Sequence, residues 1–481
     1  MRRTSRLVAA GATLATVAAI APAASAATRP HFSPGAPGIG DPYFPLEGNG
    51  GYDALHYGLD LKYDPSTKRL DGVVTMTARA TQNLSRFDLD LQQLTVAKVA
   101  VNGRKAKFTR KGQELVITPK SGLRKNTRFT VSVTYGGVPQ TIVGSPVVFG
   151  SPYGFVHTDD GAFMGDEPNA ASTWFPSNDH PSDKAAFTFK VTVPKDLGVI
   201  ANGRLVSKRT KGTETTFVWD EKAPMATYLA TADIGKWDFK FGGTPGGTKE
   251  IVAVDPKLKG RDPDHPDPMA FFWDTTGEAT DLWSKMYGGF PFDSTGAIGD
   301  LATYNGQPIG FSLETQTRPL YSDVRSTNTI AHELAHQWFG DSVSVKTWNN
   351  VWLNESFATF CQQYWAEKHG GATVHDAARN TYNRHAADDS WWNVVIADPK
   401  RDTMFHNRVY SGGAMVLEFL RERIGDEKFF TLLRDWAVQH RYGNATTEQF
   451  TALAQKISGQ DLSGFFTTWL YSPGKPDLPE G

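Results

Sequence analysis

Residues 332–336 read His-Glu-Leu-Ala-His, and Glu355 follows nineteen positions after the second histidine. Histidines four positions apart lie on one face of a helix, so both imidazoles can bind a single metal ion. Glu333 would point about 100° away from His332, beside the ion, where a general base is expected. Two histidines and one carboxylate leave the fourth tetrahedral position open for water, as catalytic zinc sites do. The spacing therefore predicts one Zn²⁺ per chain, bound by His332, His336 and Glu355.

The competing interpretation is an ordinary helix whose two histidines only pack or form hydrogen bonds. The chain contains 12 His, so a chance match to this short motif is uncommon. A glutamate at the required distance, on a second segment that also has helical spacing, makes a chance match rarer still. We therefore favour the zinc site.

Two helices must position these ligands. Residues 330–339 are an apolar helical segment, preceded by good N-cap residues at 326–328 and followed by Gly340 as the expected stop. A second helix is expected at 353–368. The connection between the two is long enough to reverse direction and return Glu355 to the first helix. This pair of helices resembles the core of the thermolysin-like metallopeptidases.

The first 26 residues have the pattern of a secretory signal peptide. Three arginines stand before an apolar stretch at 7–20, and Ala24-Ser25-Ala26 forms a small-residue cleavage site. The apolar stretch is too short to span a membrane stably. We expect a secreted protein cleaved after Ala26. The pair Arg2-Arg3 leaves the export route open between general secretion and twin-arginine export.

Composition excludes several classes of function. The full chain has a formal charge of −1, and loss of three signal arginines leaves −4. No block of Lys and Arg predicts nucleic-acid binding, and no later segment is apolar enough to predict a membrane span. Cys361 is the only cysteine, so no intramolecular disulfide is possible. We expect it to be a small buried side chain; a fifth ligand or a redox group is the alternative.

Periodicity along the chain predicts two domains and an α+β fold. Strand-like alternation dominates the first half, which indicates an all-β sandwich or saddle-like domain. The pattern becomes helical from Phe272 onward and predicts a mainly helical domain, with later helices at 411–424, 426–439 and 446–457. The ligand helices make this domain resemble a thermolysin-like zinc peptidase. The strand-like runs are 56–63, 73–80, 87–91, 129–133 and 187–193. The predicted segments are a signal peptide at 1–26, a Pro/Gly-rich arm at 27–51, the β domain at 52–237, the catalytic domain at 238–475 and a tail at 476–481.

Further motifs agree with one family in order and spacing. They make the chain resemble the gluzincin aminopeptidases, the zinc family of aminopeptidase N and leukotriene hydrolase, in a short exported form. The resemblance covers nearly all of the mature sequence. The motifs are residues 165–168 and 174–181, 224–230, 287–292, Gly310-Phe311-Ser312-Leu313-Glu314, and the segment 410–417.

The resemblance implies a mechanism of peptide hydrolysis. Zinc would activate a water molecule and polarise the scissile carbonyl. Glu333 would take a proton from the water and pass one to the leaving amine. Tyr410 would donate a hydrogen bond to the oxyanion, although a tyrosine on its own is more often a core residue.

The resemblance also implies how substrate binds. Glu314 and Glu167 would hold the protonated α-amine, so that peptides with a free N-terminus are trimmed one residue at a time. For Glu167 the alternative is a solvated turn carboxylate. The backbone of Gly310, Phe311, Ser312 and Leu313 would pair with the peptide as an added strand.

The chain departs from the family pattern in several places. Thr315 replaces Asn after the recognition glutamate, Leu313 replaces Met, and Ser312 stands where Ala is usual. Ser356 follows the third ligand where Gly is common. The chain also ends soon after the catalytic segment, so we expect it to lack the C-terminal helical domain of larger relatives and to have a more open cleft.

Two other functions compete with an aminopeptidase. One is a thermolysin-like endopeptidase, which Glu314 and Glu167 disfavour because acidic groups near the first pocket repel internal peptide bonds. The other is a catalytically silent secreted binding protein, which the complete set of His332, Glu333, His336, Glu355 and Tyr410 disfavours. Epoxide hydrolysis would need a hydrophobic tunnel, which the sequence neither shows nor excludes. The sequence also leaves the oligomeric state and the preferred N-terminal residue open.

Overall fold

The computed structural model describes residues 1, 5, 7–11 and 30–478. The chain divides into two units, Met1–His31 and Phe32–Gly481, and the second contains all the helices and strands discussed here. The predicted signal peptide and the start of the arm fall mainly on residues outside this description, so export remains a prediction. Within the described ranges, no helix has both the length and the apolar character needed to cross a bilayer.

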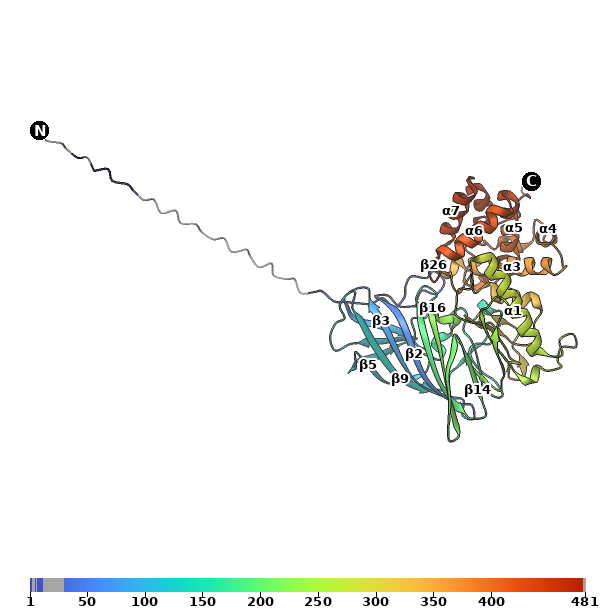
Figure 1. Ribbon diagram of the computed structural model, residues 1–481, viewed down its shortest axis with the longest axis horizontal. Helices are drawn as coiled ribbons and strands as arrows, with labels where there is room; N and C mark the ends of the chain where they lie inside the picture. The colour runs from blue at the N-terminus through green and yellow to red at the C-terminus, as the bar shows by residue number, and fades with distance from the viewer. Residues whose placement is uncertain (2–4, 6, 12–29, 479–481) are drawn as a thin grey trace. The chain divides into compact units, whose positions relative to one another are not determined.

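The first half of the compact unit is built from strands, as the alternating pattern predicts (Figure 1). All five strand-like runs fall on strands, with only Leu91 beyond the end of one; β2 (Tyr52–Asp64) is central in the largest sheet, parallel to β13 and antiparallel to β3. Its buried side chains alternate with more exposed ones because successive residues point to opposite faces. In spatial order the sheet contains β15 (Arg204–Lys211), β16 (Glu214–Ala226), β13 (Lys184–Pro194), β2, β3 (Arg69–Ala80), β9 (Arg128–Gly137), β5 (Thr95–Val101) and β6 (Arg104–Lys105).

Two smaller sheets complete this β-rich part. One carries the segment that leads to Glu167, directly after β12, and the short helix η1 (Pro146–Val148) connects two of its strands. Its order is β10 (Thr141–Ile142), β11 (Tyr153–His157), β12 (Ala162–Gly165), β17 (Ala232–Gly235) and β14 (Gly198–Ala201). The other contains β1 (Ser33–Pro34), β4 (Leu84–Asp90), β8 (Glu114–Thr118) and β7 (Lys107–Lys111).

The second half combines helices with a sheet that the sequence does not reveal. Strand β19 runs parallel to β20 and β20 parallel to β24, while β23 is antiparallel at the edge. Two of these strands have only two residues, too few to show alternation in sequence. The order is β18 (Asp238–Gly243), β19 (Lys249–Val254), β20 (Thr295–Gly299), β24 (Leu320–Tyr321) and β23 (Ser312–Leu313). The predicted domain boundary near residue 238 coincides with this change of sheet, but the boundaries themselves remain predictions.

The helices follow the predicted order, with several differences. Helix α1 begins earlier than the periodicity suggests, capped by Asp267, and α4 and α8 are not predicted. The segment that starts at residue 411 begins within a π-helix, η8 (Arg408–Gly412), before α5. The helices are α1 (Pro268–Tyr287), α2 (Thr327–Ala335), α3 (Trp352–Lys368), α4 (Val374–Arg384), α5 (Gly413–Ile424), α6 (Asp426–Gln439), α7 (Thr447–Ser458) and α8 (Ser463–Phe466).

The first ligand helix is shorter than predicted. Helix α2 is capped at its start by Ser326, whose side chain accepts from the Thr329 N–H, as expected. It ends at Ala335, so the prediction that it continues to Phe339 and stops at Gly340 is wrong. After His336 the backbone hydrogen bonds first join residues three apart, as from the Gln337 N–H to the Leu334 carbonyl. They then join residues five apart, as from the Asp341 N–H to the His336 carbonyl, so the regular helix ends. Gly340, with φ of +138°, lies in the turn that follows.

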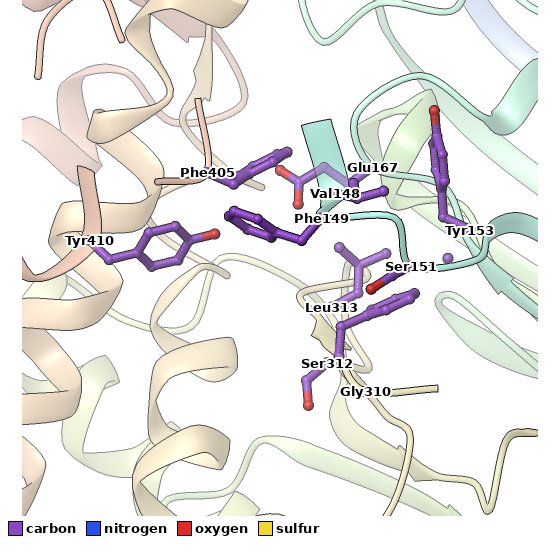
Figure 2. A pocket seen from close by; sticks show the side chains of 12 residues that line it. Val148, Phe149, Ser151, Tyr153, Glu167, Gly310, Ser312, Leu313, Phe405 and Tyr410 are labelled. Atoms are coloured by element: carbon purple, nitrogen blue, oxygen red, sulfur yellow. The ribbon is translucent and has the colours of Figure 1, made fainter. Parts of the chain in front are cut away.

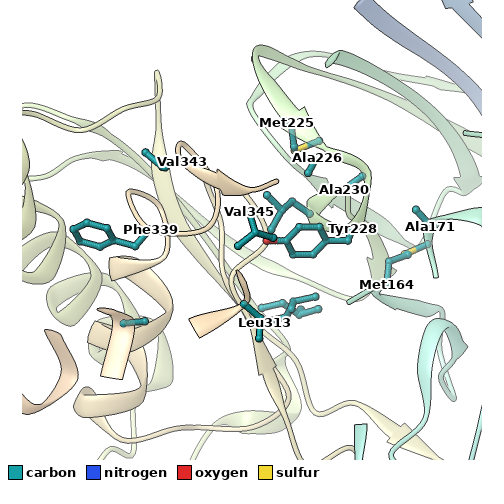
Figure 3. Close-up of a cluster of buried hydrophobic side chains, with 14 of the residues drawn as sticks. Met164, Ala171, Met225, Ala226, Tyr228, Ala230, Leu313, Phe339, Val343 and Val345 are labelled. Atoms are coloured by element: carbon teal, nitrogen blue, oxygen red, sulfur yellow. The ribbon is translucent and has the colours of Figure 1, made fainter. Parts of the chain in front are cut away.

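An apolar junction joins the β-rich part to the catalytic part (Figure 3). Met164, Met225 and Tyr228 lie in one buried cluster with Leu313 and Phe339. Because these side chains pack closely, they fix the position of the β-rich part relative to the catalytic part.

A half-buried lysine adds polar contacts at this junction. The Lys184 ammonium of β13 donates to the carbonyls of Asp341 (2.6 Å) and Ser342 (3.0 Å), directly after the first ligand segment. Burial lowers the pKa of Lys184 to about 7. The β-rich part is thereby tied to the backbone next to the metal ligands.

Candidate active site

The structure brings His332, His336 and Glu355 together. The two Nε2 atoms are 3.1 Å apart, and each lies 3.4 Å from Glu355 Oε2. Zinc bonds of about 2.0–2.2 Å in tetrahedral geometry place neighbouring ligand atoms about 3.3–3.6 Å apart. All three side chains are buried, so few competing water molecules reach the triangle. The donor set and its spacing therefore fit zinc.

Two of the three ligands, His336 and Glu355, are stabilised by their surroundings. His336 Nδ1 lies 3.0 Å from the Phe339 carbonyl, which can only accept, so the hydrogen resides on Nδ1 and Nε2 is free for a metal. Glu355 lies in the first turn of α3, where the helix favours a carboxylate. Burial alone would raise the pKa of Glu355, but the charges and hydrogen bonds of His336 and His332 lower it to about 2.

Two more carboxylates lie next to this triangle. Glu314, Glu333 and His336 each place a ligand-type atom within 4.8 Å of the others. Glu333 is 7% exposed, and burial raises the pKa of its carboxyl well above the ordinary range. A buried carboxylate with a raised pKa is suited to accept a proton and return it. The position agrees with the role predicted for Glu333, which remains a prediction.

Glu314 and Glu167 approach from the two halves of the compact unit. Glu314 follows the edge strand β23, and the Tyr228 hydroxyl donates to it at 3.5 Å. Glu167 follows β12, and its Oε1 has no hydrogen-bond partner within the described ranges. Burial and the neighbouring charge of Glu314 raise the pKa of Glu167 well above its ordinary range. A cation bound near both carboxylates would offset their mutual repulsion and lower the pKa of Glu167, since an opposite charge favours the ionised form.

Tyr410 reaches the site from the π-helix η8. Its ring lies parallel to the His332 ring, with centroids 6.2 Å apart. Burial raises the pKa of Tyr410, so its hydroxyl stays protonated and can donate a hydrogen bond. Single π turns often occur at functional sites.

A cavity of about 230 Å³ opens beside these groups (Figure 2). Gly310, Phe311, Ser312 and Leu313 line one wall, and β23 is the edge strand of its sheet, so its outer backbone can pair with a peptide. Figure 2 shows Glu167 and Tyr410 with their polar ends toward the same space.

Sequence reasoning found Phe311 and Tyr410 but missed two other aromatic side chains of this cavity, Phe149 and Phe405. Phe149 follows η1 in the β-rich part, is 71% exposed and has φ of +54°. Phe405 lines the cavity from the catalytic part, and Val148 lies beside Phe149. The apolar triplet Val147-Val148-Phe149 in an otherwise turn-rich segment is the only sequence signal that could have identified this wall.

The remaining predicted residues are also placed. Cys361 is buried in α3, with its sulfur 3.2 Å from the Tyr287 hydroxyl, and burial raises its pKa to about 12. It does not join the ligand triangle. The structure thus favours the small buried side chain over the fifth-ligand alternative.

Comparison with known families decides the classification. The profile of the Peptidase M1 N-terminal domain matches residues 53–229, and that of the Peptidase family M1 domain matches residues 291–469. The chain belongs to peptidase family M1. The expected resemblance is therefore confirmed, as are the β-rich first part and the helical peptidase part. Together with the ligand triangle, membership of this family identifies zinc as the cofactor.

Individual relatives of this M1 protein differ in length. It is 28% identical over 412 residues to Tricorn protease-interacting factor F2 of Thermoplasma acidophilum, which covers 81% of this chain and 49% of that protein. It is 26% identical over 440 residues to aminopeptidase N of Lactococcus lactis, covering 88% of this chain and 51% of the relative. The chain thus spans about half the length of these relatives. A solved M1 zinc metallopeptidase of Deinococcus radiodurans is 25% identical to this chain, with a TM-score of 0.80. The match covers 92% of this chain and 99% of the Deinococcus chain.

Proposed function

We propose that this M1 protein is a zinc aminopeptidase that removes the N-terminal residue from peptides. The observation that carries the proposal is the pair Glu314 and Glu167: Glu314 lies beside the zinc ligand His336, and Glu167, whose pKa is raised by burial and by the charge of Glu314, lines the cavity. An α-amine with a pKa of roughly 7.7–8.0 is largely protonated at neutral pH and would be bound there. This limits the peptide to one residue ahead of the zinc.

The chain's own residues account for the chemistry. When bound, zinc supplies a Lewis acid that polarises a carbonyl and acidifies a water molecule. Glu333 takes the proton of the attacking water and passes it to the leaving amine. Tyr410 donates a hydrogen bond to the developing oxyanion. The edge strand β23 aligns the substrate backbone, which sets the scissile bond against these groups.

The cavity also supports a preference among N-terminal residues. Aromatic and aliphatic side chains dominate its wall, and among the described residues Glu167 is the only acidic one that lines it. A large apolar side chain would gain the most from leaving water here. We therefore propose that N-terminal Phe, Leu and similar residues are preferred.

Two further observations bear on the proposal. A variant of a two-domain M1 zinc metallopeptidase, 25% identical to this chain, has been solved bound to L-arginine. A free amino acid is the product that an aminopeptidase releases, so this neighbour supports exopeptidase activity. The signal pattern of residues 1–26 supports export of the protein, which would then act on peptides outside the cytoplasm.

Kinetics with free and N-acetylated phenylalanyl amides test the proposed function. The native, zinc-loaded protein should cleave the free form and leave the acetylated form nearly intact.

Two variants test the assigned roles. Glu333→Gln should lower kcat by about a hundredfold or more while keeping its zinc. Glu314→Ala should raise KM for the free amine and discriminate much less between the free and acetylated substrates. Equal cleavage of both forms by the native protein would instead favour an endopeptidase, and no cleavage of any peptide would favour a binding protein.

A further inference from the structure

Ser356 connects the third zinc ligand to the segment that carries Tyr410. It directly follows Glu355 in α3 and is completely buried. Its hydroxyl donates to the backbone carbonyl of Val409 at 2.6 Å. Val409 precedes Tyr410 in the π-helix η8, so one hydrogen bond joins residues adjacent to both functional groups.

The same serine determines how closely two helices approach. Gly413 has φ of −68° and ψ of −39°, an ordinary helical conformation that any residue adopts. Its lack of a side chain is required for another reason, because a Cβ at this position would overlap the Ser356 hydroxyl. The start of α5 therefore packs directly onto Ser356, three residues after Tyr410.

A second close contact holds the other side of the π turn. A Cβ at Gly412 would come within 2.9 Å of the Arg408 side chain and 3.0 Å of Trp391. The Arg408 guanidinium is fully buried and lies 4.6 Å and 4.5 Å from the ring centroids of Trp391 and Trp392. This side of the turn is fixed by packing, whereas the side facing the zinc ligands is fixed by Ser356.

We propose that Ser356 is a positioning residue for Tyr410, which holds the π turn at a set distance from Glu355. A π turn is a rare, poorly favoured backbone arrangement and needs external contacts to persist. Loss of the Ser356 hydrogen bond would leave the Val409 carbonyl buried with one partner fewer and let the turn relax. The Tyr410 hydroxyl would then move relative to the ligand triangle. The proposal rests on the oxyanion role proposed above for Tyr410.

A double-mutant cycle tests this coupling. Ser356→Ala should lower kcat about tenfold on a free phenylalanyl amide, with KM changed less than twofold and one zinc retained per chain. In the Tyr410→Phe background the same substitution should cause almost no further loss, because the group that it positions is already gone. Equal losses in both backgrounds would overturn the proposal, since they would show that Ser356 acts independently of Tyr410. Loss of zinc in Ser356→Ala would overturn the proposal as well, because the lower activity would then come from the zinc ligand Glu355 and not from Tyr410.

Ser458→Ala provides the matched control. Ser458 is also buried on a helix of the catalytic part, and its hydroxyl also donates to a backbone carbonyl, that of Gln455. It should leave kcat unchanged within twofold.

Crystal structures of the zinc-loaded native protein and of Ser356→Ala decide the same point without activity. The proposal expects the Tyr410 hydroxyl to move away from Glu355 in the variant, and an unmoved hydroxyl would overturn it. If the native protein cleaves no peptide, the proposed function fails, yet these two structures still test whether Ser356 positions Tyr410.

Discussion

Single carboxylates in this protein differ widely in what stabilises their charge. Glu355 lies against two histidines and has a pKa of about 2. Glu250 in β19 is also buried; the nearby Lys240 charge favours its ionised form, but burial outweighs it and raises the pKa of Glu250 to about 8. The first carboxylate is ionised and ready to bind a metal, whereas the second is largely protonated at neutral pH. Sequence alone predicts the role of Glu355 from its spacing but gives no sign of the state of Glu250, because that state depends on neighbours distant in the chain.

Glu250 should therefore make stability depend on pH. The pKa of Glu250 is higher in the folded protein than in the unfolded chain, because the folded state favours the protonated carboxyl. The contribution of Glu250 to the free energy of unfolding is therefore complete below pH 4.5 and is lost as the pH rises through 8. Glu250→Gln keeps the shape without the charge, and should raise the free energy of unfolding at pH 8 by on the order of 1 kcal/mol or more. At pH 5 the variant and the native protein should differ little.

Urea unfolding at the two pH values measures this difference. Asp238→Asn is the control for removal of a carboxylate charge, since Asp238 is exposed at the start of β18. A gain for Glu250→Gln that is equal at pH 5 and pH 8 would contradict the assignment of a raised pKa.

At the scale of elements, prediction succeeds where the signal is local. The long strands β2, β3 and β13 appear as alternating side chains, and Ser326 marks the start of α2. The two-residue strand β23 and the π turn at Tyr410 leave no such signal, because a sheet partner and a packed serine impose them. The end of α2 was misplaced for the same reason, since the bonds after His336 depend on the following turn.

The loop between β10 and β11 shows how an element can contribute to specificity. It places the exposed Phe149 on the wall of the cavity. Phe149→Ala should lower kcat/KM about tenfold for phenylalanyl and leucyl amides, because the ring no longer covers a large apolar side chain. Alanyl amides, whose side chain is too short to use this wall, should be cleaved within twofold of the native rate.

Phe241→Ala is the matched control for this prediction, because Phe241 is an exposed aromatic residue of β18 that does not line the cavity. Parallel measurements of kcat/KM on the three amides suffice. An equal loss on alanyl and phenylalanyl amides would show that Phe149 affects the site as a whole and does not select the side chain.

At the scale of the whole molecule, the site is complete only where the two parts meet. The catalytic part supplies the zinc ligands, Glu333, Glu314 and Tyr410, while the β-rich part supplies Glu167, Tyr228 and Phe149. The junction depends on long-range contacts such as those of Lys184, which no local pattern predicts. Family motifs could therefore identify the participants, but the cavity wall and the positioning contacts needed the structure.

The central claim is that this site cleaves one residue at a time from a free N-terminus. The most direct measurement is a mass-spectrometric time course of an unblocked decapeptide that begins with Phe-Leu, incubated with the zinc-loaded native protein. We predict a ladder in which products shorten by single residues from the N-terminus, with free phenylalanine released first. Internal fragments in the earliest samples would contradict the claim.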